Sequence, residues 1–184
     1  MSPSSSNARS SAPTRQDKPM ASDSMSQFVN LSALLTGISA DKLVPPLSPS
    51  TVPQQIFTAA QQQGGATFTA LLGVYADAVA QGKTDAQIAA AVFSQNGADV
   101  CYLARSIMLA WYLGSWYDPK VLQAYNSPTP PPGPPGSTVL SAEAYTQGWS
   151  WNVAQAHAMG YSNYTFGYWG KPPPALADFT GAAS

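Results

Sequence analysis

The chain has 184 residues, of which 45% are hydrophobic and only 9% are charged, and its formal net charge at pH 7 is -1. Ordinary soluble domains carry about a quarter charged residues, so a partner is expected to cover much of this surface. The small net charge excludes nucleic acid and anionic lipid as principal partners, because both require a basic surface. No apolar run reaches the roughly 18 residues of a membrane span, so none is predicted.

The N-terminal part contains a tail and then the start of a helical domain. Residues 1–24 are rich in Ser, Pro and Ala and show no apolar period, so we predict a disordered tail there. Residues 25–184 are predicted to form one domain with a modest core. Its first helix carries apolar residues from Phe28 to Leu35 and ends at Gly37, since glycine is favoured just past a helix end.

Three further helices are predicted before residue 97. One begins after Thr51 with Pro in its first turn and ends at Gly64, and the next ends at Gly82. Thr84 and Gln87 have the spacing of a capping box, which indicates the start of the fourth helix. Short connections marked by glycine predict antiparallel neighbours and hence a bundle.

The stretch 98–118, ADVCYLARSIMLAWYLGSWYD, is predicted to be the central helix. Its helically spaced apolar positions are Val100, Leu103, Ala104, Ile107, Met108 and Trp111. Arg105 is the only charge between Asp99 and Asp118, so the helix is apolar nearly all round and must be covered. We expect its first three turns to lie in the core and Cys101 to be a buried thiol. We expect its final segment, AWYLGSWYD, to contact a partner.

The C-terminal part changes character after Asp118. Residues 127–137, SPTPPPGPPGS, are predicted to form a stiff surface loop or, alternatively, a polyproline strip that docks on aromatic rings of a partner. Residues 141–159 are predicted to form one helix, followed by an extended aromatic segment. The expected fold is therefore all-α, a small bundle of about five to six helices.

The sequence contains no recognisable catalytic or cofactor-binding motif. There is no C-x-x-C-H, no G-x-G-x-x-G and no P-loop, and one cysteine cannot hold an iron–sulfur cluster. His157 is the only histidine and has no nucleophile motif to serve. The carboxylates that might converge are Asp77, Asp85, Asp99 and Glu143, although caps and solvated faces explain them better. We therefore predict no catalytic residue, no cofactor and no metal site in this chain.

Aromatic residues are concentrated at the end of the central helix and near the C-terminus. Such rings either fill a core or anchor an interface, and the low charge favours an interface. The candidate interface residues are Trp111, Tyr112, Trp116, Tyr168, Trp169, Lys171 and Pro172.

Three motifs resemble a known family in order and spacing: LSALLTG at 31–37, ARSIMLAWYLG at 104–114 and GYSNYTFGYWGKPP at 160–173. They are similar to the small subunit of bacterial membrane-bound FAD-dependent sugar and polyol dehydrogenases, such as fructose, sorbitol and glucose dehydrogenases. The resemblance implies a non-catalytic subunit that stabilises the FAD-containing catalytic subunit and helps its export to the periplasmic side of the inner membrane. It also implies a multihaem cytochrome c subunit that accepts the electrons.

The N-terminus departs from that family pattern. Family members begin with a twin-arginine signal and an apolar segment, whereas here Arg9 and Arg15 are separated and no apolar segment follows them. Cytoplasmic localisation is therefore the alternative. Two other functions stay open: a carboxylate-dependent hydrolase that uses Asp99 or Glu143, and a proline-rich adaptor that uses residues 127–137.

Overall fold

A computed structural model describes residues 18–46, 50–158 and 180–181, and there the fold is all-α, as predicted. The elements are α1 (Lys18–Thr36), α2 (Ala40–Leu43), α3 (Val52–Gly64), α4 (Ala66–Ala80), α5 (Asp85–Ala90), the π-helix η1 (Ala91–Gln95), α6 (Gly97–Leu113), β1 (Ser115–Trp116), α7 (Pro119–Tyr125), β2 (Thr138–Val139), α8 (Ala142–Thr146) and α9 (Trp149–Val153). Within these ranges no helix is both long enough and apolar enough to cross a membrane.

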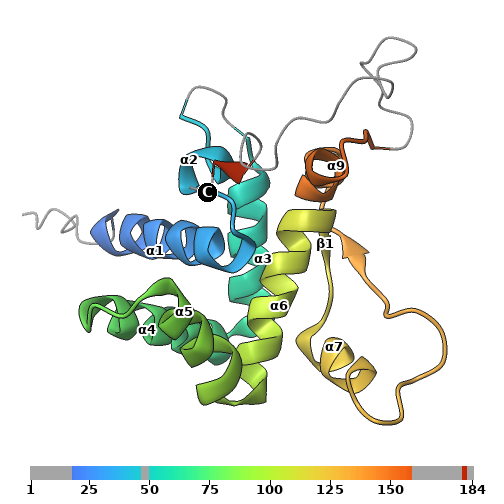
Figure 1. The fold of residues 1–184 in the computed structure, drawn as a ribbon. Helices are drawn as coiled ribbons and strands as arrows, with labels where there is room; N and C mark the ends of the chain where they lie inside the picture. Colours follow the sequence, from blue (N-terminus) through green and yellow to red (C-terminus); the bar gives the residue numbers. More distant parts are fainter. Residues whose placement is uncertain (1–17, 47–49, 159–179, 182–184) are drawn as a thin grey trace, which may run out of the picture.

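The central helix α6 organises the bundle. It packs against α1, α3, α4, η1, β1, α7, α8 and α9. In Figure 1, α1 and α4 lie to one side of α6 and α7 lies to the other. The antiparallel pair β1–β2 lies at the C-terminal end of α6, with Ser115 opposite Val139 and Trp116 opposite Thr138. The layers are therefore arranged around one buried helix, as its apolar composition predicts.

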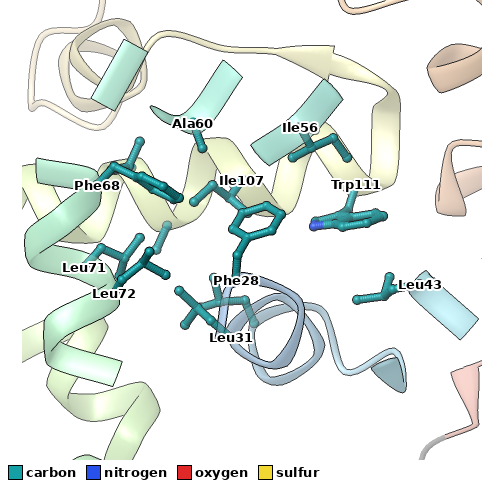
Figure 2. Close-up of a cluster of buried hydrophobic side chains, with 14 of the residues drawn as sticks. Phe28, Leu31, Leu43, Ile56, Ala60, Phe68, Leu71, Leu72, Ile107 and Trp111 are labelled. Atoms are coloured by element: carbon teal, nitrogen blue, oxygen red, sulfur yellow. The ribbon is translucent and has the colours of Figure 1, made fainter. Parts of the chain in front are cut away.

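Aromatic rings from four helices meet in the core. Phe28 of α1 makes edge-on contacts with Phe57, at 5.3 Å between ring centroids, and with Phe68, at 6.0 Å. The same ring stacks on Trp111 of α6 at 6.4 Å, and Figure 2 shows Ile107 beside this group. Val100, Leu103, Ala104 and Ile107 are all buried, so the prediction that the first turns of α6 form core is confirmed.

Several helix ends are where local sequence chemistry placed them. Gly37 and Gly82 mark predicted helix ends and adopt positive φ angles of 71° and 66°, which glycine tolerates best. The central helix, predicted over 98–118, instead ends at Leu113, where Gly114 adopts a φ of 64° and the chain turns into β1. The capping box is also confirmed: the Thr84 backbone N–H donates to the Gln87 side chain at 2.9 Å, and the Gln87 N–H donates to the Thr84 hydroxyl at 3.4 Å.

Other boundaries differ from the prediction. Helix α1 begins at Lys18, inside the stretch predicted to be tail. The single helix predicted over 141–159 is wrong for the described part, because α8 and α9 are separate there. The break is at Gly148, where a Cβ atom would lie 2.8 Å from the Tyr112 carbonyl oxygen. Gly148 has a ψ of 130°, which is not helical, and it packs closely against the end of α6.

Candidate partner interface

The two tryptophans predicted to contact a partner are buried inside the chain. Trp111 is 3% exposed and stacks on Phe28, whereas Trp116 is 7% exposed and lies in β1. Both belong to the core of this chain, so a surface available to a partner must use their neighbours. The predicted residues Tyr168, Trp169, Lys171 and Pro172 lie outside the described residues.

Tyr112, the third predicted residue on α6, lies half-buried at the edge of the core. Its hydroxyl donates a hydrogen bond of 2.7 Å to the Thr36 carbonyl oxygen at the end of α1. Burial raises the pKa of the Tyr112 phenol, so the hydroxyl keeps its proton and remains a donor. The hydrogen bond fixes the ring in place, and the ring forms part of the wall of a groove.

This groove, of about 450 Å³, lies between α6 and α7 and is open to solvent. Its lining is predominantly apolar and consists of Tyr102, Arg105, Met108, Leu109, Tyr112, Leu113, Leu122, Tyr125 and Asn126. Arg105 is the one charged residue in this lining set. We call this feature the α6/α7 groove.

The groove exists because α7 is too short to cover α6. Helix α7 has 7 residues against 17 in α6, and it begins where the Asp118 carboxylate accepts the N–H groups of Lys120, at 2.7 Å, and Val121, at 3.4 Å. At its other end, the Asn126 amide donates to the Tyr102 hydroxyl at 2.8 Å. The Asp118 bonds cap the start of α7, and the Asn126–Tyr102 bond attaches its other end to the first half of α6, so the apolar surface beyond it is left half-covered.

Sequence reasoning named neither Leu109 nor Leu122 as a contact residue, whereas Leu113 lies in the stretch AWYLGSWYD that was predicted to meet a partner. Leu109, Leu113 and Leu122 are each half-buried. The available signal was the second apolar stripe on α6, since Leu109 and Leu113 are four residues apart and lie off the face that carries Ile107. A second stripe on a helix that already fills a core indicates a further contact surface.

Arg105 is exposed and lies at one end of the groove. Its guanidinium carbon is 4.9 Å from the centre of the Tyr102 ring, a cation–π geometry. Arg105 forms no ion pair with the residues that the structure describes. The groove thus combines an apolar floor with one positive charge that is oriented by an aromatic ring.

Asp99 and Glu143, the two carboxylates of the hydrolase hypothesis, lie at opposite ends of α6. Asp99 is in the first turn of α6, whereas Glu143 lies beside Ala144, which packs on Gly114 at the opposite end. Fifteen residues of helix separate these ends by about 22 Å, too far for a cooperating acid–base pair. In the described ranges no three His, Cys, Asp or Glu side chains form a group that could hold a metal ion.

Glu143 has a structural role instead. Its carboxylate accepts hydrogen bonds from the Thr51 hydroxyl, from the Ser50 hydroxyl at 2.9 Å and from the Thr51 backbone N–H at 3.2 Å. These bonds, chiefly the one from the Thr51 hydroxyl, hold the pKa of Glu143 below its ordinary value. Glu143 therefore ties α8 to the start of α3. The ring Nδ1 of His157 lies 3.1 Å from the Ala158 carbonyl oxygen.

A second cavity lies on the other side of α7. It has a volume of about 380 Å³, and its walls include Asp99, Asp118 and Lys120. The sequence suggested no link between the two aspartates, which belong to different helices. The Asp118 carboxylate already accepts N–H groups at the start of α7. We therefore assign no catalytic role to this cavity.

The proline-rich run is a surface loop. Its prolines are exposed except for Pro135, which is half-buried, and the Tyr125 hydroxyl donates to the Pro134 carbonyl oxygen at 3.1 Å. Bends at 127–129 and a φ of 82° at Gly133 divide the run. A continuous polyproline helix requires φ near -75° throughout, so this loop does not present one long strip.

No family model, no curated protein and no solved structure matches this chain.

Proposed function

We propose that this chain is a non-catalytic accessory subunit that binds and stabilises the FAD-containing catalytic subunit of a bacterial sugar or polyol dehydrogenase complex. The observation that carries the proposal is the α6/α7 groove, an apolar surface beside the core of a chain with 9% charged residues. An apolar groove of this kind is a candidate binding site for a partner. The resemblance of three motifs to the small subunits of this enzyme class names the partner.

The subunit would act by mass action. A partner that binds only the folded flavoprotein stabilises it by RT ln(1 + [L]/Kd), which is about 2.7 kcal/mol when the free subunit is present at about 100 times Kd. Oxidation of the sugar would take place at FAD in the catalytic subunit, and a multihaem cytochrome c subunit would accept the electrons. The complex is proposed to work at the periplasmic side of the inner membrane, with the cytoplasm as the alternative.

The hydrolase and adaptor hypotheses have less support. Asp99 and Glu143 lie at opposite ends of α6, and the proline-rich loop is divided by Gly133. Neither arrangement favours the corresponding function, whereas the groove favours a binding subunit.

The test is purification of the tagged chain from its native cell, followed by an absorption spectrum of the complex. We expect a co-purifying large subunit with the flavin bands of FAD, in equimolar amount. Heating the flavoprotein with and without the chain should show a higher melting temperature in its presence. A chain that elutes as a free monomer, with no flavoprotein at any stage, would refute the proposed function.

A further inference from the structure

We propose that the α6/α7 groove receives a short amphipathic helix of the catalytic subunit, and that a carboxylate on this helix pairs with Arg105. The inference rests on the proposed function and specifies the chemistry of the partner segment. It depends on three properties of the groove: its helical walls, its apolar floor and its single charge.

The walls favour a helix over an extended segment. An added strand needs free backbone N–H and C=O groups along an edge, but both walls of this groove are helices, whose backbone groups bond internally. A helix instead binds through side chains at i, i+3, i+4 and i+7, which fit between the ridges of two helices. The occupant is therefore expected to present an apolar stripe with helical spacing.

The floor defines where that stripe would lie. Met108, Leu109 and Leu113 line the α6 side of the groove, and Leu122 and Tyr125 line the α7 side. All five are half-buried, so a docked helix would complete burial that the chain has already begun. The Tyr112 ring, held by its hydrogen bond to Thr36, is a rigid part of this wall.

Arg105 defines the charge of the occupant. The Tyr102 ring holds the guanidinium at 4.9 Å, and the Tyr102 hydroxyl is itself fixed by the Asn126 amide at 2.8 Å. A helix that docks on the apolar floor would remove water from this guanidinium, and a desolvated charge without a partner is strongly unfavourable. A carboxylate on the occupant removes that penalty and suits the forked donors of arginine.

The experiment measures the dissociation constant between the purified chain and the catalytic subunit at two salt concentrations. Arg105→Met keeps the aliphatic stem and removes the charge, and we expect it to weaken binding by about 30-fold or more. The matched control is Lys120→Met, which removes one positive charge from α7 outside the groove lining and should change binding by less than about twofold. Salt should weaken the wild-type complex more than the Arg105→Met complex.

A second variant tests the apolar floor. Leu109→Glu places a carboxylate in the groove and should weaken binding by at least about tenfold. Circular dichroism and thermal unfolding of each variant identify a fold defect. If Leu109→Glu fails to fold, Arg105→Met, at an exposed position, still provides the test.

A photo-crosslinking amino acid at Leu113 identifies the occupant. We expect the crosslinked peptide to come from a helix of the catalytic subunit that contains Asp or Glu. Changing that acid to Lys should weaken binding to the wild type and restore binding to Arg105→Asp.

Three results would overturn the inference while leaving the proposed function intact. They are equal effects of Arg105→Met and Lys120→Met, a crosslinked peptide without an acidic residue, and a crosslink to a second copy of this chain accompanied by a dimer in solution. Failure of the wild-type chain to bind any flavoprotein would instead refute the proposed function itself.

Discussion

Gly114 ends α6 at the point where the chain turns into β1, and it provides a sharp test of how this end of the bundle is packed. Its φ is 64°, and a Cβ atom there would overlap the carbonyl group of Ala144 and lie 2.5 Å from the backbone nitrogen of Tyr145. In Gly114→Ala the left-handed backbone conformation costs about 1–2 kcal/mol. Moving α8 away from the new methyl group adds about 1–3 kcal/mol, so the free energy of unfolding should fall by about 2–5 kcal/mol.

Gly82→Ala is the matched control for this prediction. Gly82 has nearly the same φ, 66°, but a Cβ atom there meets nothing within 4 Å. It should therefore cost only the conformational part, about 1–2 kcal/mol. Urea unfolding followed by tryptophan fluorescence measures both, because Trp111 and Trp116 lie buried on either side of Gly114. Equal losses of stability in the two variants would show that α8 does not pack against Gly114 as described.

Two further changes test the core and the attachment of α8. Among the described residues, the buried indole Nε1 of Trp111 has no hydrogen-bond partner. Trp111→Phe should therefore cost at least about 2 kcal/mol less than Trp111→Ala, for which about 3–5 kcal/mol is expected. Equal costs in urea unfolding would contradict this. Because the pKa of Glu143 is lowered from 4.5, the stabilisation from its ionised form is present above that pH and is lost as the pH falls through the folded-state pKa. Glu143→Gln should therefore reduce stability near neutral pH and flatten its decline in acid, as measured by urea midpoints between about pH 6 and about pH 3. An unchanged acid dependence would show that the bonds to Thr51 do not stabilise the fold.

The helix class and many helix ends follow from the sequence because they depend on neighbours along the chain. Gly37 and Gly82 follow the ends of their helices, and glycine adopts the positive φ required there without the steric penalty of a side chain. Thr84 and Gln87 satisfy each other's backbone N–H groups across one turn. The periodic apolar face of α6 also identified its buried first turns, because a helix apolar all round must be covered.

The orientation of individual rings and the shape of the α6/α7 groove depend on contacts between segments far apart in the chain. Trp111 lies in the core rather than on the surface, and Phe28 of α1 stacks on it. The sequence left this choice open because Phe28 is far from Trp111 along the chain. Gly148 lies close to the Tyr112 carbonyl group, 36 residues away in the sequence, and a local sequence pattern cannot predict such a contact. The groove depends on how far α7 extends along α6. The sequence alone therefore determined that the chain is helical and that α6 is apolar on all its faces. The tertiary structure decided which of these apolar residues are buried and which line the α6/α7 groove, because burial depends on which segments pack together.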